Sequence, residues 1–469
     1  MKLNKLALSV ALAAAVASTG ANAAKIYADY PVTVKGYEGS AETSVAYTGQ
    51  AARQVLHTSL KKLSGKGTGD ANPELKAQML AYFSGTEAGR DIISPASKAG
   101  FPVKQTKVDE LSKGKNLAGK TYKGAVPAWP GNLTGPEVIE FMIDKAAASE
   151  KGYDPVNGLD YIQLISKFAM GAVFYNQAVD NYLDEKLEAN TKPNDKAYGE
   201  GKPYTGKEHV WDEAFGYFGA PAHALSLTPK QAYNIAKAKP EAFALADANK
   251  DGVVSLYDET VYAHAYYAAG ADKSGKTNYF HTITNAFIDG RQLITNADGK
   301  KLTDAQRTEL KGYAAVIAEN WEKVIAEAAF KYAGSVYKDI EKLNKTLDES
   351  GDINDIYRKY AKHWGELKGF AMALQVSGKD IGSTATELNR LIGFSPVLLG
   401  NTQVVAVDAN GKYVQAASVS LDEYMLNMAK VQQVLVDKFA IKARSNDVLG
   451  NIDALVKVLG EQAAEAEND

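Results

Sequence analysis

Apolar side chains recur at helical spacing along most of this chain. In the clearest segment, which begins at Tyr161, they alternate steps of four and three residues and include Ile165, Phe168, Ala172, Tyr175, Val179 and Tyr182. This spacing predicts a helix that presents one apolar face to a bundle core. Similar patterns predict further helices at 49–63, 136–145, 230–238, 259–269, 278–294, 303–345, 353–376, 384–392, 420–444 and 446–463. The fold is therefore predicted to be mainly α-helical.

Signals for strands and loops are few. The segments TQVVAVD and KYVQA flank Asn410-Gly411, and an Asn-Gly pair between two such segments predicts a small β-hairpin. Residues 100–135 are rich in Gly, Lys and Pro without a clear period, which predicts a long surface connection. Ser420 and Glu423 have the spacing of a capping box, which marks the start of a C-terminal helix.

Two helical segments resemble each other. AVFYNQAVDNYLDEKL at 172–187 is similar to AAFKYAGSVYKDIEKL at 328–343. Each is followed by a polar loop and then by the pattern W-x-E-x-x-G-aromatic, at 211–217 and at 364–370. Chance similarity between helical sequences is the alternative explanation. The pattern favours a duplicated helical bundle.

The segment DANKDGVVSLYD, residues 247–258, has the pattern of an EF-hand calcium loop. Oxygen donors occupy its positions 1, 3, 5, 9 and 12, and Gly252 stands at position 6, where the chain turns sharply. The predicted calcium ligands are the side chains of Asp247, Asn249, Asp251, Ser255 and Asp258 and the carbonyl of Val253. An acidic turn that binds no metal is the alternative. Because the loop is single and closes with Asp, we favour a structural ion over a calcium switch.

The first 23 residues have the features of a secretory signal peptide. Lys2 and Lys5 precede an apolar segment, and Ala21 to Ala23 form a small-x-small cleavage site. We predict cleavage after Ala23 and a periplasmic or secreted chain without a transmembrane segment, because the apolar segment is too short to span a bilayer.

Composition narrows the possible partners and site types. The chain has no cysteine, which excludes disulfides and thiolate metal sites. Cleavage would leave 51 basic and 56 acidic residues, a formal charge of −5, so we expect no nucleic-acid partner. We divide the sequence into a signal peptide (1–23), an N-terminal helix with extended and loop regions (24–135), a first helical repeat (136–225), a calcium-loop insertion (226–275) and a second repeat with C-terminal helices (276–469).

Two histidines each precede a carboxylate by three residues beside the repeated pattern. They are His209 with Asp212 and His363 with Glu366, and Glu213 follows the first pair. Residues i and i+3 share a helix face, so each pair could bind one metal ion. If the two helices face each other, both pairs could contribute ligands to one site. Imidazole and carboxylate ligands suit zinc, iron or manganese. A structural hydrogen bond is the alternative for each histidine.

These features resemble a known family. The signal peptide, the paired helices and the segment GKEHVWDE are similar to the imelysin-like periplasmic proteins, which are marked by G-x-H-x-x-E. SVAYTGQAARQVLHTSL, LDYIQLISKFAMGAVFYNQAVDNYLDEKL and HVWDEAFGYFGAP more closely resemble an uncharacterised domain family related to the imelysins. The resemblance implies a two-bundle helical fold, a metal site and a link to bacterial iron uptake. In this chain Gly206 lies three residues before His209, and Asp212 stands where the marker has Glu.

Three functions remain open. We favour an exported, non-enzymatic metal- or ligand-binding protein of the bacterial envelope, linked to iron acquisition and carrying one structural calcium ion. An imelysin-type metallopeptidase is the second, although the sequence contains no H-E-x-x-H, G-x-S-x-G or P-loop motif. A calcium-stabilised adhesion or scaffold protein with an envelope partner is the third.

Overall fold

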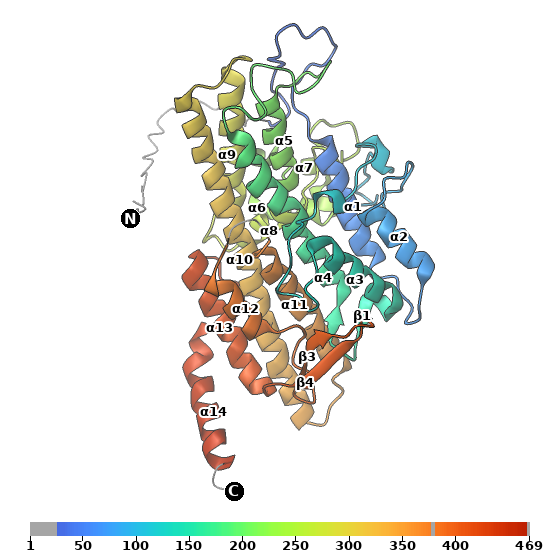
Figure 1. Cartoon of the computed structure of the whole chain (residues 1–469), viewed down its shortest axis with the longest axis vertical. Coiled ribbons are helices and arrows are strands. Elements are labelled where there is room, and N and C mark those ends of the chain that lie inside the picture. The colour runs from blue at the N-terminus through green and yellow to red at the C-terminus, as the bar shows by residue number, and fades with distance from the viewer. Residues whose placement is uncertain (1–25, 377–379, 467–469) are drawn as a thin grey trace.

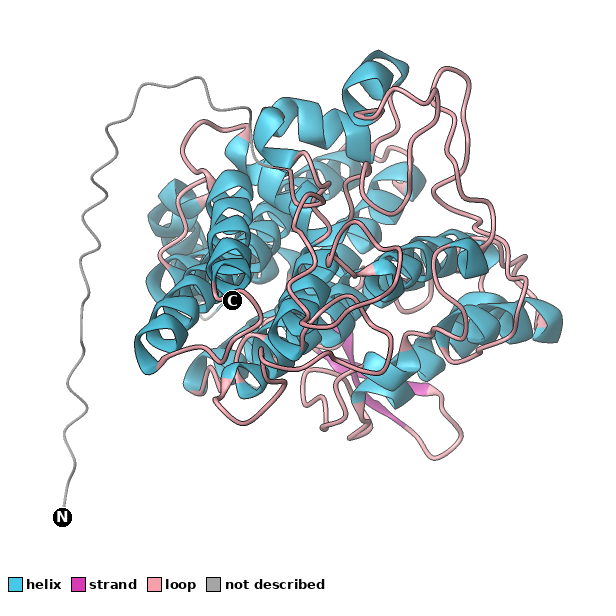
Figure 2. Ribbon diagram, turned by 90° about the horizontal axis from the view of Figure 1, so that it is seen from above, coloured by secondary structure: helices cyan, strands magenta, loops and turns pink. Residues whose placement is uncertain are grey.

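Helices form most of the computed structural model, which describes residues 26–376 and 380–466. Figure 1 shows the helices stacked along the long axis, and Figure 2 shows the strands confined to one edge of the molecule. The mainly α-helical prediction is confirmed. The predicted signal peptide, residues 1–23, lies outside the described residues.

The N-terminal half carries two short hairpin-like strands among its helices. The helices are α1 (Thr48–Leu63), α2 (Pro73–Phe83), α3 (Gly135–Ala148), α4 (Tyr161–Ala169), the π-helix η4 (Met170–Tyr182) and α5 (Gly206–Phe218). The antiparallel strands are β1 (Tyr153–Asp154) and β2 (Leu159–Asp160). Short 3₁₀ turns are η1 (Val108–Glu110), η2 (Ala118–Lys120), η3 (Glu150–Gly152) and η5 (Glu185–Leu187).

The C-terminal half contains the longer helices. The elements are η6 (Ala224–Ser226), α6 (Pro229–Ala236), η7 (Pro240–Ala242), α7 (Phe243–Ala246), α8 (Ala263–Asp272), α9 (Tyr279–Asn296), α10 (Asp304–Asp348), α11 (Asn354–Ala373), α12 (Ser383–Ile392), α13 (Leu421–Phe439), η8 (Leu449–Asn451) and α14 (Ile452–Ala466). β3 (Thr402–Val407) and β4 (Tyr413–Ala417) form the predicted hairpin around Asn410-Gly411.

Helix α10, 45 residues long, runs along much of the molecule and packs against α9, α11 and α13. It begins at a capping box, in which Thr303 and Gln306 each bind the other's backbone N–H. Ser420 and Glu423 form the predicted box at the start of α13. Such boxes satisfy N–H groups that a helix end leaves without partners.

The two similar helical segments each pack with the helix that follows them. η4 lies against α5, and α10 lies against α11, while α4 also packs along α11. One contiguous hydrophobic core includes residues from Tyr27 to Val448. The duplication, its imelysin-like arrangement and the predicted segment boundaries stay predictions.

Glycines allow α11 to approach α4 and the adjoining η4 closely. A Cβ atom on Gly369 would lie 2.5 Å from Cβ of Lys167, and one on Gly171 would lie 2.3 Å from Cβ of Ala373. Side chains cannot approach this closely without strain, so larger residues would separate the helices. The packing brings the Lys167 side chain beside the facing turns of α11.

The α4 helix widens into the π-helix η4 where outside groups bind its carbonyls. His57 Nε2 donates to Ser166 O, His264 Nε2 donates to Met170 O, and the Tyr122 N–H donates to Ala172 O, at 2.9, 3.0 and 2.7 Å. A carbonyl with an external donor depends less on its own helical N–H, which favours the wider turn. π segments are rare and are frequent at functional sites.

Two sequence predictions need correction. No helix was predicted between 63 and 136, but the structure has α2 at Pro73–Phe83. The segment 100–135 forms no α-helix before α3, as predicted, but it is not confined to the surface. Its apolar side chains are buried against the helices at Phe101, Val103, Val108, Leu111, Leu117, Val126 and Trp129. These residues lack a helical period because they anchor an irregular segment.

None of the described helices combines the length and the apolar character needed to cross a membrane.

Candidate functional site

The predicted pair His209 and Asp212 points in two directions on α5. His209 Nε2 lies 3.8 Å from Glu213 Oε1, and the His209 ring stacks on Tyr204 with ring centroids 4.5 Å apart. Gln50 Nε2 donates to the same Glu213 oxygen at 2.7 Å. Burial lowers the pKa of His209, an effect that Glu213 opposes. The structure thus joins His209 to Glu213 and leaves Asp212 on another side of the helix.

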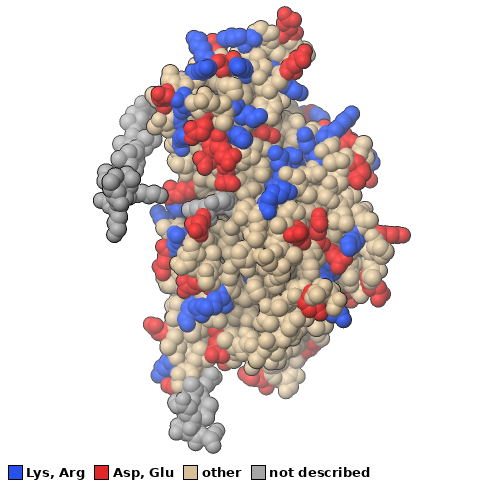
Figure 3. All heavy atoms as spheres, viewed as in Figure 1, with Lys and Arg blue, Asp and Glu red and all other residues tan. Residues whose placement is uncertain are grey.

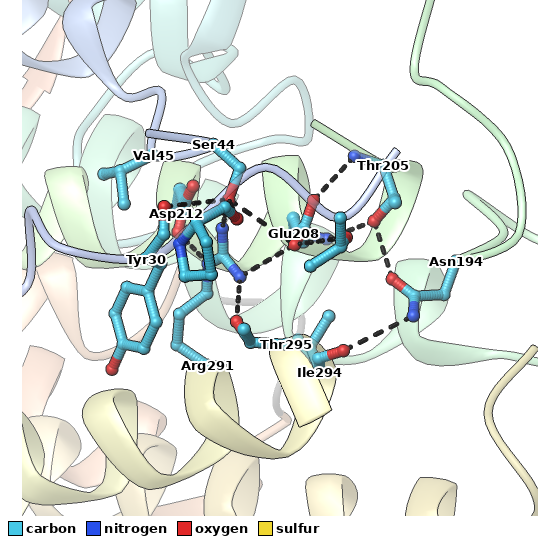
Figure 4. Close-up of polar contacts among 12 residues, drawn as sticks. Tyr30, Ser44, Val45, Asn194, Thr205, Glu208, Asp212, Arg291, Ile294 and Thr295 are labelled. Atoms are coloured by element: carbon cyan, nitrogen blue, oxygen red, sulfur yellow. Dashed lines mark hydrogen bonds and ion pairs between the residues drawn. The ribbon is translucent and has the colours of Figure 1, made fainter. Parts of the chain in front are cut away.

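Asp212 belongs to a buried ion-pair network with Arg291 of α9 (Figure 4). The guanidinium contacts Asp212 at 2.9 Å and Glu208 at 3.0 Å, and all three side chains are 0% exposed. Arg291 also donates to Thr295 and Ser44, each at 2.6 Å. Because Ser44 lies in the segment before α1, the network fastens that segment to α5 and α9. A permanent cation already neutralises Asp212.

The second predicted pair is also separated. His363 Nδ1 lies 2.5 Å from Asp339 Oδ2 of α10. Glu366 lies one helical turn further along α11 and interacts with Lys167 and Tyr332 instead. Although residues i and i+3 share a helix face, each of these side chains has its partner on a neighbouring helix: His363 on α10, and Glu366 on α4 and α10.

The two predicted pairs therefore do not combine into one site. Across residues 26–376 and 380–466, no three His, Cys, Asp or Glu side chains are grouped as a metal site would require. Binding of iron, zinc or manganese by His209, Asp212, Glu213, His363 and Glu366 stays a prediction.

The predicted calcium loop has part of the expected geometry. Gly252 adopts a φ of +89°, a left-handed conformation that glycine tolerates. The Asp247 carboxylate accepts the N–H of Asp251 and of Gly252, each at 3.1 Å. Val254 forms a parallel bridge with Val103, which fixes the loop to the connection between α2 and α3.

The closing end of the loop departs from an EF-hand. Glu259, one residue beyond the predicted last ligand Asp258, accepts three loop N–H groups, those of Ala248, Asn249 and Ser255. Lys104 Nζ lies 2.9 Å from Asp251 Oδ2 and supplies a positive charge there. The exiting helix predicted from residue 259 starts only at Ala263, because Glu259 turns back to the loop. Calcium binding by this loop stays a prediction.

A cavity of about 350 Å³ lies between α1, α4, α8 and α11. Four lysines and one carboxylate line it together with tyrosines; we call it the lysine cavity and define it by Lys61, Lys98, Lys167, Lys237 and Glu366. Lys98 and Lys237 are exposed, Lys61 is half-buried, and Lys167 is 3% exposed. The amino groups thus extend from solvent to the interior.

Lys167 is the unusual group in this cavity. Among the described residues, no carbonyl or carboxylate accepts a hydrogen bond from its amino group. The Lys61 amino group lies within hydrogen-bond reach of it, and the rings of Tyr267 and Phe370 have centroids 5.4 and 5.9 Å from Nζ. Burial lowers the pKa of Lys167 well below its usual range, Lys61 lowers it further, and Glu366 acts in the opposite direction. The side chain as a whole is nearly buried, but it lines the cavity, where a ligand is able to reach it.

Tyrosines connect the lysine cavity to a second cavity of about 270 Å³. Tyr266, Tyr267 and Tyr332 line both. Burial raises the pKa of Tyr332, and the adjacent Glu366 carboxylate raises it further. The phenol therefore stays protonated and is able to donate a hydrogen bond to Glu366 or to a ligand.

Sequence reasoning missed Lys167, although a signal was present. In LISKFAMGAVFY, residues 164–175, Ser166 and Lys167 are the polar positions. A helix that is apolar on all sides is buried, so a lysine within it must also be buried. Its proximity to Lys61 and Glu366, from two other helices, could not be read from the sequence.

The chain is thus a mainly helical protein with a cavity that lysines and tyrosines line. The chain belongs to the family described as Domain of unknown function (DUF4856), whose model matches residues 141–380, just over half of the chain. No curated protein and no solved structure matches the chain. The predicted uncharacterised-domain family is thus confirmed, whereas nothing links the chain to the imelysins.

Proposed function

We propose that this protein is an exported, non-enzymatic binding protein of the bacterial envelope that holds a small anionic molecule in the lysine cavity. The observation that carries the proposal is the Lys167 amino group, which is buried at the cavity and has no acceptor among the described residues. An oxygen atom of a bound anion would supply that acceptor.

Charge supports an anion over a cation. Four lysine side chains line the cavity against the single carboxylate of Glu366. On the face of the molecule shown in Figure 3, basic and acidic side chains are interspersed. The concentration of one sign inside a partly enclosed cavity would raise the local concentration of an oppositely charged ligand.

Size and lining support a small organic molecule. A volume of about 350 Å³ lies within the range of small-molecule sites, roughly 300–1,000 Å³. Tyr262, Tyr266 and Tyr267 supply aromatic surface and hydroxyl groups. Such sites combine an apolar lining with a few polar groups that orient the ligand.

The metal-related expectations have weaker support. The iron link rests on the resemblance to imelysins, and the structural calcium ion rests on the pattern of residues 247–258. Elemental analysis of the purified protein tests both. Transition-metal content that is equal in the wild type and in a His209→Ala/His363→Ala variant would contradict the His/carboxylate site. No observation on the described residues specifically supports the metallopeptidase or the adhesion alternative.

Equilibrium dialysis with a panel of carboxylates, from lactate to citrate, and with inorganic phosphate tests the anion site. Lys61→Met should weaken binding of the best anion about 10- to 100-fold, because a hydrogen bond to a charged group contributes roughly 1.5–3 kcal/mol. Lys62→Met is the matched control, since Lys62 is exposed on the same helix and does not line the cavity. Equal binding by the wild type and Lys61→Met for every anion would refute the proposal.

Lys167→Met separates function from stability. Burial desolvates the charged form of Lys167, which opposes folding, so this variant should unfold at the same temperature as the wild type or at a higher one. It should nevertheless lose anion binding. If Lys167 instead stabilised the fold, the Lys167→Met variant would have a lower melting temperature than the wild type.

A further inference from the structure

The lysine cavity holds the groups needed for a covalent reaction with a carbonyl compound. We propose that Lys167 forms an imine with an aldehyde or ketone that carries a carboxylate, such as a 2-oxo acid. This inference rests on the proposed anion-binding function and assigns the chemical class of the ligand.

An amine attacks a carbonyl carbon only when its nitrogen lone pair is available. Two features of the cavity lower the pKa of the Lys167 amine and so favour its neutral form: its burial, and the neighbouring Lys61 side chain. A desolvated lysine next to a second cationic group is a recognised way to activate an amine for imine formation. In the described part of the chain, no hydrogen bond ties the Lys167 nitrogen to an acceptor, so it is available to a ligand.

The remaining groups match the other parts of such a ligand. Lys61 is half-buried beside Lys167 and is placed to bind the carboxylate next to the reacting carbonyl. Lys98 and Lys237 lie at the exposed end of the cavity and would attract the anion from solvent. The rings of Tyr267 and Phe370 cover the Lys167 side chain and limit access of water.

Imine formation needs proton transfer, which Glu366 and Tyr332 can provide. Nζ of Lys167 bonds to the carbonyl carbon, and Glu366 takes one proton from this nitrogen and passes it to the carbonyl oxygen. In the resulting carbinolamine, Glu366 takes the remaining proton from the nitrogen and passes it to the hydroxyl group, which leaves as water as the C=N bond forms. The products are one imine and one water, and no oxidant or reductant takes part. Tyr332 interacts with Glu366 and is able to donate a hydrogen bond to the carbonyl oxygen.

The first helical pair offers a comparison within the same chain. Glu213 occupies the position in W-x-E-x-x-G that corresponds to Glu366, but Gln50 donates to it, and His209 lies beside it. A glutamine amide does not act as a nucleophile. The proposed chemistry is therefore a property of the second pair, where α11 crosses α4 at Lys167.

Borohydride trapping tests the inference. The full-length mature chain is incubated with pyruvate or glyoxylate, reduced with sodium borohydride and mapped by peptide mass spectrometry. The reduced adduct should be at least ten times more abundant on Lys167 than on the exposed Lys62. Lactate has no carbonyl group and should give no adduct, although it should compete with pyruvate.

Two variants distinguish the role of the lysine from that of its neighbours. Lys167→Met should abolish the adduct, and Glu366→Gln should slow its formation at least tenfold while lactate binding persists. Rates measured against pH should rise as the amine loses its proton, which a purely structural role of Lys167 would not produce.

Labelling of Lys167 no greater than that of Lys62 would overturn the inference. If anions still bind and Lys61→Met still weakens their binding, the proposed anion-binding function stands and only the imine is refuted. If the panel anions bind equally to the wild type and to Lys61→Met, the proposed function fails as well.

Discussion

Replacing Arg291 by Met tests the buried network that fastens the N-terminal segment to α5 and α9. The substitution keeps much of the side-chain volume but removes the charge that faces Glu208 and Asp212. Both carboxylates are fully buried and would be left without a neutralising partner. Breaking a buried ion pair in this way costs about 3–5 kcal/mol, a large part of a typical folding free energy of about 5–15 kcal/mol.

The cost should depend on pH in a defined direction. Burial raises the pKa of Asp212 to about 6, although Arg291 acts to lower it. Without Arg291 this pKa should rise further. A carboxyl group whose pKa is higher in the folded than in the unfolded state binds more protons when folded, so it favours folding at low pH. The variant should therefore be least destabilised near pH 4 and should lose stability as the pH rises through about 6.

Urea denaturation followed by circular dichroism from pH 4 to pH 8 measures this effect. A triple variant, Arg291→Met with Glu208→Gln and Asp212→Asn, is the matched control, because it keeps hydrogen-bond acceptors at both positions without their charges. It should recover part of the lost stability at pH 7 and should show a flatter pH profile. A cost for Arg291→Met that is independent of pH, with no recovery in the triple variant, would show that lost packing and not uncompensated charge is responsible.

Three further predictions concern two buried histidines, the contact between α4 and α11, and the predicted calcium loop. Burial lowers the pKa of His57 to about 3 and that of His264 to about 4, so the stability that these neutral side chains contribute should be complete above pH 6.5 and should be lost as the pH falls toward 3. Acid denaturation of His264→Gln should therefore be less steep than that of the wild type, and an unchanged profile would contradict a neutral imidazole at His264. Gly369→Ala should lower the free energy of unfolding by about 1–3 kcal/mol, because the added Cβ would lie 2.5 Å from Cβ of Lys167. The same variant should weaken anion binding in dialysis, and normal binding would show that the distance between α4 and α11 does not control the cavity. Chelation with EDTA should lower the melting temperature of the wild type but not that of Asp247→Asn. Equal melting curves with and without EDTA, and no calcium in the purified protein, would contradict the predicted calcium site.

Local sequence patterns determined most of the secondary structure. The stripe from Tyr161 to Tyr182 is helical, and the Asn410-Gly411 hairpin and the Ser420 capping box form as predicted. These features depend on side-chain period, turn chemistry and capping, which act over a few residues. The widening of the helix after Ala169 could not be predicted in this way, since its donors come from α1, α8 and the segment before α3.

The candidate site shows the limit of spacing arguments. His209 and Asp212 share a helix and a spacing of three, but Asp212 pairs with Arg291, 79 residues away in sequence. His363 pairs in the same way with Asp339 and not with Glu366. A helix fixes the directions of its side chains, whereas the partners in those directions belong to other elements.

The sequence by itself determined that the chain is mainly helical, that it resembles an uncharacterised domain family, and which segments carry chemically capable residues. Only the tertiary structure decided which of those residues meet. Lys61, Lys167 and Glu366 come from α1, α4 and α11, and they line one cavity because Gly369 lets α11 approach α4 closely. Local periodicity follows from neighbours in the chain, but a site follows from the packing of helices that are distant in sequence.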